Sequence, residues 1–161
     1  MAPAKREVRL VDDRLQAEFQ LIKANVAGVQ GTLVATSDGF LVAHDLPGVN
    51  LTDVAALLAA SRALAIRGIA VTGRGQFREA LTRGTDGYLA VYAAGNDAIL
   101  AVIGTTELNV GMLHFRVRDS LDRIAGYAAS FGRWNTPGGP VAADPGDDAG
   151  RGLPTRRRGA S

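Results

Sequence analysis

Hydrophobic residues recur at helical spacing in three stretches of the chain and cluster in five shorter stretches typical of strands. The first helical stretch spans residues 12–26, where Asp12 or Asp13 can cap the start and Gly28 lies just past the end. Its apolar face is formed by Leu15, Phe19, Ile22 and Val26. This pattern predicts an amphipathic helix.

The five short stretches are separated by turn sequences, which predicts hairpins. Residues 31–36 and 40–44 flank Ser37-Asp38-Gly39, where glycine takes a positive φ at no steric cost. The other three strands are expected over residues 76–83, 88–93 and 98–103. Thr85-Asp86-Gly87 and Gly95-Asn96-Asp97 join them, and both are tight-turn sequences.

Two further helices complete the pattern. The middle one is expected over residues 51–67, with Asn50 as its cap and Gly68 at its end. The last one starts at Thr105 or Thr106 and runs to about Ser130. Its apolar stripe is Val110, Leu113, Val117, Leu121, Ile124 and Ala128. The order α-β-β-α-β-β-β-α predicts an α+β fold, a five-stranded antiparallel sheet sandwiched by helices.

The middle helix lacks a polar face, because only Ser61 and Arg62 are polar between Val54 and Ile66. A helix that is apolar all round must be covered on two sides. We expect the larger side chains, Val54, Leu57, Leu58, Leu64 and Ala65, to face the sheet. The smaller side would be covered by a second copy in a two-fold contact, and the alternative is burial under the chain's own C-terminal segment.

One such helix contact is too small to hold a dimer, so a second contact is expected from residues 76–81, whose alternating pattern suits a half-exposed edge strand. The predicted dimer interface is therefore Ala55, Ala56, Ala59, Ala63, Ile66, Phe77, Arg78 and Glu79.

Composition divides the chain at about Gly132. Residues 132–161 are rich in glycine, proline and arginine and are expected to be a disordered tail. Residues 12–131 form the expected domain and residues 1–11 an N-terminal extension. The net charge of +2 comes from the tail, because residues 1–131 carry 13 basic and 13 acidic residues, so no nucleic-acid-binding face is expected. No signal peptide, disulfide or inserted membrane span is expected, which favours a cytoplasmic protein.

Chemistry-bearing residues are sparse. His44 and His114 have no ligand partner at motif spacing, and the serines lack a nucleophile elbow. The glycine-rich residues 68–77 lack the Gly-Lys-Ser/Thr ending of a phosphate-binding loop and precede a strand rather than a helix. The arginine run at 156–158 is more typical of a solvated tail than of a site for RNA or lipid. We expect no enzyme, no metal and no cofactor.

Three phrases of the chain resemble the roadblock / dynein light chain family. They are VAGVQGTLVATSDG at residues 26–39, the alanine-rich LTDVAALLAASRALA at 51–65 and AILAVIGTTELNVGML at 98–113. The Gly-Val-x-Gly opening and the Leu-Asn-Val-Gly start of the last helix are similar to that family's hallmarks. The resemblance covers about residues 12–130.

The resemblance implies a homodimer whose two sheets join or abut, with its second helices side by side. It also implies a Ras-like small GTPase as partner, with a sensor kinase complex as a further candidate, because bacterial relatives act beside such GTPases, often within membrane-kinase signalling operons. By analogy Arg62, Arg67 and Arg74 are candidates for GTPase docking. One of them could enter the GTPase site, or docking could realign the GTPase's own groups. A passive dimeric scaffold and a profilin- or PAS-like ligand sensor are the alternatives.

Overall fold

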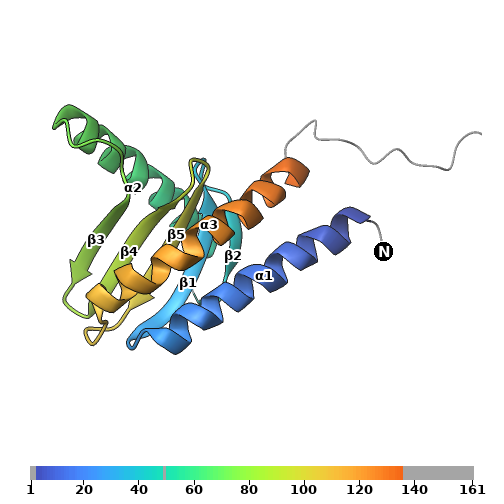
Figure 1. The fold of residues 1–161 in the computed structure, drawn as a ribbon, viewed down its shortest axis with the longest axis horizontal. Coiled ribbons are helices and arrows are strands. Elements are labelled where there is room, and N and C mark those ends of the chain that lie inside the picture. The colour runs from blue at the N-terminus through green and yellow to red at the C-terminus, as the bar shows by residue number, and fades with distance from the viewer. Residues whose placement is uncertain (1–2, 49, 136–161) are drawn as a thin grey trace, which may run out of the picture.

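The computed structural model describes residues 3–48 and 50–135, with side chains described for 12–48 and 50–131. Eight elements follow one another along the chain (Figure 1). The helices are α1 (Pro3–Asn25), α2 (Leu51–Val71) and α3 (Val110–Asn135). The strands are β1 (Val29–Thr36), β2 (Leu41–His44), β3 (Glu79–Gly84), β4 (Gly87–Ala94) and β5 (Ala98–Gly104).

The five strands form one antiparallel sheet in the order β2-β1-β5-β4-β3. The first and the last strand pair in its centre, where Leu33 lies opposite Ala101. Strands β2 and β3 are the two edges. The predicted α+β fold with a five-stranded antiparallel sheet is confirmed.

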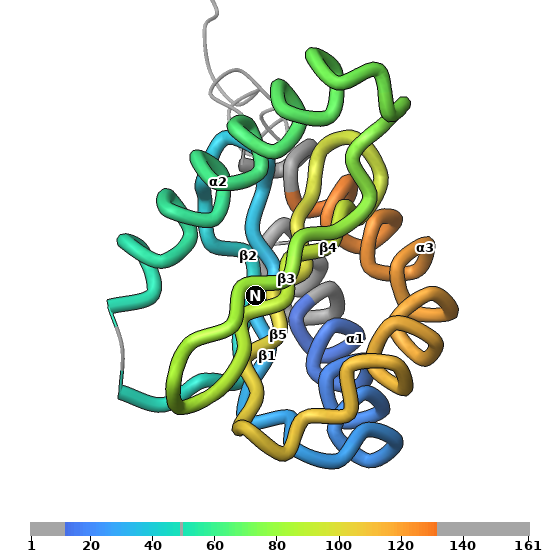
Figure 2. Tube along the Cα trace, turned by 90° about the vertical axis from the view of Figure 1, so that its left-hand side faces the viewer, coloured from blue at the N-terminus to red at the C-terminus, as the bar shows by residue number. Residues whose placement is uncertain are grey.

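Helices cover the two faces of the sheet unequally. Helices α1 and α3 pack side by side on one face and α2 crosses the other (Figure 2). The larger core lies under α1 and α3 and contains Phe19, Tyr92 and Leu113, each at most 2% exposed. The smaller core lies under α2. It consists of Leu33, Ala35, Ala55, Leu58, Val91, Ile99 and Ala101, with a margin of half-buried residues.

An ion pair fastens α1 to α3. The Arg123 Nε donates to Glu18 Oε1 over 2.6 Å and its Nη2 donates to Glu18 Oε2 over 3.0 Å. This bidentate geometry is the strong form of the arginine–carboxylate contact, and the Glu18 hydrogen bond raises the pKa of Arg123. Arg14 also lies over the Tyr127 ring at 5.5 Å. The two helices are therefore antiparallel neighbours.

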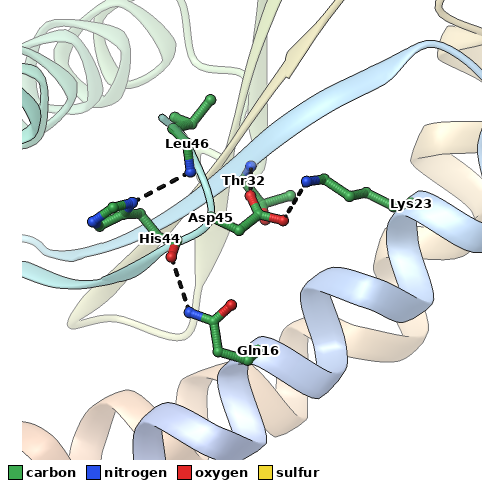
Figure 3. Close-up of polar contacts among 6 residues, drawn as sticks. All are labelled: Gln16, Lys23, Thr32, His44, Asp45 and Leu46. Carbon is green, nitrogen blue, oxygen red and sulfur yellow. Dashed lines mark hydrogen bonds and ion pairs between the residues drawn. The ribbon is translucent and has the colours of Figure 1, made fainter. Parts of the chain in front are cut away.

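A polar cluster ties α1 to the end of β2 (Figure 3). Asp45 Oδ1 accepts hydrogen bonds from the Thr32 backbone N–H and hydroxyl, and its Oδ2 pairs with Lys23 Nζ at 2.5 Å. Gln16 Nε2 donates to the His44 carbonyl over 2.9 Å. This cluster fixes the point at which the chain leaves the sheet toward α2.

Helices α1 and α3 both begin at other residues than predicted. Helix α1 starts at Pro3, so neither Asp12 nor Asp13 caps it. Helix α3 starts at Val110, and Asn109 Oδ1 accepts from the Met112 N–H over 2.9 Å as its cap. Thr105 instead closes the preceding turn through the Glu107 N–H. The buried stripe of α3 is as predicted, with Leu113, Val117 and Ile124 fully buried.

Helix α2 also differs from the prediction at its end. It continues through Gly68 to Val71, and Gly73 just beyond it has a φ of +65°. Gly73 therefore occupies the left-handed position expected after a helix C-terminus, which the sequence analysis assigned to Gly68. At the other end Asn50 precedes the helix without a side-chain capping bond and donates instead to Asp53 over 2.7 Å. Of the predicted tail, the residues after Asn135 lie outside the described part of the chain.

Candidate functional site: helix α2, strand β3 and the turns beside them

Large apolar side chains that remain exposed gather on α2. Leu57 is 67% exposed, Leu64 72% and Val71 88%. The C-terminal end of α2 projects past the strands (Figure 1). Large exposed apolar side chains that cluster on one element are typical of interaction sites.

The side of α2 that faces the sheet was predicted wrongly for two residues. Ala55 and Leu58 are the fully buried members, whereas Leu57 and Leu64 point away from the sheet. The reason is helical phase, because Leu58 faces the sheet together with residues 51, 54 and 55, which precede it by one or two helical turns. Ala55, expected at the dimer interface, is 0% exposed and contributes to the core.

The exposed part of α2 has two flanks. Leu57, Leu64 and Val71 recur every seven residues, and we refer to them as the leucine flank. On the other side of the helix lies the alanine flank, which consists of Ala56, Ala59, Ala63 and Ile66. Ala59 is half-buried and Ile66 is 37% exposed, so the alanine flank exposes smaller and less protruding side chains than the leucine flank.

Strand β3 is the free edge of the sheet next to the end of α2. Among the residues that the structure describes it pairs with β4 alone, from Glu79 opposite Tyr92 to Gly84 opposite Gly87. Its outer backbone groups are therefore available to another strand. Arg78 and Glu79 are exposed and Phe77 is half-buried. The Arg78 carbonyl accepts from the Ala93 N–H over 2.9 Å, so the extended pairing starts just before β3.

The three candidate arginines, Arg62, Arg67 and Arg74, differ in how exposed their side chains are. Arg62 is half-buried, and its Nη2 donates to the Asn96 carbonyl in the β4–β5 turn over 2.9 Å. Arg67 and Arg74 are exposed, one on the outer ridge of α2 and the other in the loop that leads to β3. Arg62 therefore fastens α2 to the sheet, and the other two can reach a partner.

Two turns lie against α2 next to the alanine flank. A Cβ placed on Gly39 would lie 3.2 Å from the Ala56 Cα and 3.5 Å from the Ala59 Cβ, so the turn packs closely on α2, and its φ of +92° favours glycine there. Ser37 Oγ donates to the Asn96 carbonyl and its N–H donates to the Asp97 carbonyl, which joins the β1–β2 and β4–β5 turns.

Phe40, directly after Gly39, is 61% exposed, although the sequence pattern predicted it only as the first residue of a strand. The one sequence feature that marked Phe40 as a possible surface residue is the position of a large aromatic side chain directly after a turn sequence.

The histidines serve the fold. His114 Nδ1 lies 2.8 Å from Tyr92 Oη, with the rings in an edge-to-face arrangement. His44 Nδ1 accepts from the Leu46 N–H. Burial, and secondly the negative charge of Glu79, raise the pKa of Tyr92 above its ordinary value of 10.0. Within the described residues no cluster of three histidine, cysteine or carboxylate side chains could hold a metal ion.

Helix α2 is also the one helix of the described residues that is long and apolar enough to cross a membrane. Length and composition alone give this result, and helices of soluble proteins pass the same test, so it is weak evidence. No inserted membrane span was expected from the sequence, and this helix is the element that bears on that expectation.

A sheet with helices on both faces, an exposed apolar helix and an open edge strand define a small α+β interaction module. The Roadblock/LC7 domain family matches residues 16–104, and the chain belongs to this family.

The chain has relatives in sequence and in structure. It is 30% identical to the uncharacterized protein MJ0310 of Methanocaldococcus jannaschii over 98 residues, which are 60% of this chain and 85% of that protein. It is similar in structure to MglB in a tetrameric arrangement, with a TM-score of 0.67 and 19% identity, over 74% of this chain and 90% of that one.

A Roadblock/LC7 domain from Streptomyces avermitilis has a TM-score of 0.64 and 18% identity, over 70% of this chain and 96% of that one. Profilin IB of Acanthamoeba castellanii shares the fold at a lower TM-score of 0.51, with 16% identity over 70% of this chain and 98% of that one. At these identities the structural likenesses establish the fold: roadblock-type and profilin-like.

Proposed function

We propose that this protein is a non-catalytic, homodimeric regulator that binds a Ras-like small GTPase and modulates its nucleotide state in a cytoplasmic signalling system. The observation that carries the proposal is the exposed apolar surface of α2 beside the open edge of β3, in a chain of the Roadblock/LC7 family. Proteins of this family are regulators and adaptors rather than enzymes, and the MglB proteins similar in structure favour a GTPase pathway.

The second copy is proposed to cover the leucine flank and to pair with β3. Leu57, Leu64 and Val71 recur at the seven-residue spacing with which two helices pack side by side. Six such side chains, three from each copy, contribute on the order of 10 kcal/mol if fully buried. Association costs ~4–15 kcal/mol, so backbone pairing along β3 is needed as well.

Charges favour an antiparallel arrangement of the two α2 helices. Asp53 lies near the start of α2 and Arg67 near its end, both on the side turned away from the sheet and both exposed. If Leu57 of one copy packs against Leu64 of the other, Asp53 of each copy lies beside Arg67 of its partner. The predicted interface is thereby revised toward the leucine flank, and Phe77, Arg78 and Glu79 keep their proposed place at the edge.

For the GTPase, the exposed Arg67 and Arg74 are the proposed docking arginines. An arginine placed at the developing phosphate charge accelerates hydrolysis by ~10³–10⁵. In the alternative mechanism, docking realigns the GTPase's own catalytic groups. The rate of hydrolysis would then depend on the whole docking contact and not on a single arginine. Because Arg62 is engaged with the Asn96 carbonyl, it is proposed to act as a structural residue.

The test uses the full chain and purified Ras-like GTPases of the source organism, each loaded with GDP or with a non-hydrolysable GTP analogue. The proposal predicts binding that depends on the nucleotide and a changed rate of phosphate release or nucleotide exchange. Binding that is equal for both nucleotides and leaves both rates unchanged would favour a passive scaffold. Absence of binding to every such GTPase would contradict the proposal.

If phosphate release is accelerated, the variants Arg67→Ala and Arg74→Ala separate the two mechanisms. Loss of more than about a hundredfold in either variant indicates an inserted arginine. A loss that only follows weakened binding indicates realignment of the GTPase's own groups.

A further inference from the structure

We propose that two copies join their β3 strands in a single antiparallel register, with Leu81 opposite Leu81 and with Glu79 opposite Arg83 of the second copy. The inference rests on the proposed function, which includes pairing of two copies along β3. It goes beyond that proposal because it assigns the two-fold axis to one residue and names the charges by which the chain recognises a copy of itself.

Three exposed residues of β3 share the face of the sheet on which α1 and α3 pack. Glu79 lies opposite Tyr92, which belongs to the larger core. The Arg83 guanidinium lies over the ring of Tyr88, its neighbour in β4, at 5.6 Å. Leu81 stands between the two charged residues and is 42% exposed. An acidic and a basic side chain thus flank a leucine at equal distances along one face of the strand.

The backbone groups of the same three residues point to the open side of β3. The Arg78 carbonyl accepts from the Ala93 N–H of β4 over 2.9 Å. Residues of a strand alternate in the direction of their polar groups, so the N–H and C=O groups of residues 79, 81 and 83 point away from β4. Two residues that lie opposite each other and both point inward exchange two hydrogen bonds. A second β3 strand must therefore set odd-numbered residues opposite odd-numbered residues.

Charge selects one register among those that meet this condition. With Leu81 opposite Leu81, Glu79 of each copy lies opposite Arg83 of the other, and two ion pairs can form. A register with Glu79 opposite Glu79, or with Arg83 opposite Arg83, sets like charges against each other, which is unfavourable. The registers between these extremes and the centre place Leu81 opposite a charged residue. The register centred on Leu81 is the one that pairs unlike charges and joins two leucines.

One chain does not satisfy these charges by itself. The Cα atoms of Glu79 and Arg83 lie about 13 Å apart along the strand, with Leu81 between them. Within the described part of the chain the ion pairs all involve α1, so neither residue has an oppositely charged partner there. Charged residues on an edge strand usually prevent its pairing with other strands. Here the order of the two signs matches a second copy that runs in the opposite direction.

Charge exchange between two variants tests the register. Glu79→Arg sets arginines opposite each other and Arg83→Glu sets glutamates opposite each other, so each variant alone is expected to self-associate about tenfold more weakly or worse. An equimolar mixture of the two is expected to form dimers again, because each arginine then meets a glutamate of the other variant. Sedimentation equilibrium measures each variant, and native mass spectrometry identifies the mixed dimer from a mass tag on one chain.

Two further variants serve as controls. Arg116→Glu makes the same change of charge on the exposed surface of α3, away from the sheet edge. It is expected to self-associate within about threefold of the natural chain and to leave Glu79→Arg without a mixed dimer. The double variant Glu79→Arg with Arg83→Glu restores both ion pairs with their signs exchanged and is expected to dimerise by itself. Recovery in the mixture or in the double variant excludes misfolding as the cause of the single losses.

Cross-linking locates the two-fold axis independently, because the chain contains no cysteine. In the proposed register the two residues of Leu81→Cys form a hydrogen-bonded pair with Cα atoms about 5.5 Å apart, which is within the range of a disulfide. Thr82→Cys lies opposite Ala80 of the second copy, so its two sulfur atoms are farther apart. Under mild oxidation Leu81→Cys is expected to cross-link at least about tenfold faster. Equal rates, or a faster Thr82→Cys, would overturn the register.

The outcomes separate this inference from the proposed function. If the natural chain is a dimer and both single charge variants also dimerise alone, or if their mixture gives no mixed dimer, the register is wrong and the inference is overturned. A dimer held by the leucine flank, and the proposed function with it, would then still stand. If the natural chain is a monomer at every concentration, the inference and the proposed dimer fail together.

Discussion

At the scale of single residues, the candidate arginines divide into structural and exposed ones. Removal of the Arg62 side chain deletes its hydrogen bond to the Asn96 carbonyl and the link between α2 and the β4–β5 turn. Arg62→Ala is therefore expected to lower the free energy of unfolding by about 1 kcal/mol. Arg74→Ala, in the loop before β3 and outside the proposed contact between the α2 helices, should change it by less than about 0.5 kcal/mol, because the side chain is exposed. Urea denaturation measures both, and equal effects would contradict the assignment.

Tyr92 is expected to make the free energy of unfolding fall at high pH. The folded state keeps the Tyr92 proton, because burial raises the pKa of the phenol, while the unfolded chain releases it near the ordinary value of 10.0. Stability from this group is therefore complete below about pH 10 and falls as the pH rises above it. Denaturation between pH 9 and 11 should give a downward slope in the natural protein that is reduced in Tyr92→Phe. An unchanged slope would contradict the role of Tyr92.

At the scale of elements, the end of α2 can be tested with two glycines. Gly68 lies inside the helix with open space where a Cβ would stand, so Gly68→Ala should raise the free energy of unfolding by about 0.5–1 kcal/mol. Gly73 has a φ of +65°, so Gly73→Ala should lower it by about 1 kcal/mol. Thermal denaturation of the pair tests the helix boundary. The opposite order of the two effects would place the end at Gly68.

The same glycines illustrate how far the sequence predicts the elements. The spacing of apolar residues identified all eight elements and the buried stripe of α3. In α3 the prediction succeeded because only the side of the helix that faces the core is apolar. It did not find the end of α2, since Gly68 and Gly73 are both plausible stop signals and only the backbone angle distinguishes them. It also missed the phase of α2. In a helix that is apolar on every side, no contrast marks which leucines face the sheet.

At the scale of the whole molecule, function follows from what one chain leaves uncovered. The sheet has a helical pair on one face and a single helix on the other, and that single helix carries four large exposed apolar side chains next to the open edge of β3. The exposure of Phe40 could not be predicted from the sequence, because it depends on which elements cover the end of the hairpin. Family resemblance indicated the class of partner and gave no information on which flank each partner occupies.

Sedimentation equilibrium of the natural chain and of Leu64→Arg tests the central claim most directly. The account predicts that the natural chain has twice the monomer mass of 16.8 kDa. Leu64→Arg places a charge in the leucine flank and should give the monomer mass, whereas Phe115→Arg, on the outer face of α3, should keep the dimer. A natural chain that remains at 16.8 kDa at high concentration, or a Leu64→Arg variant that still dimerises, would contradict the account.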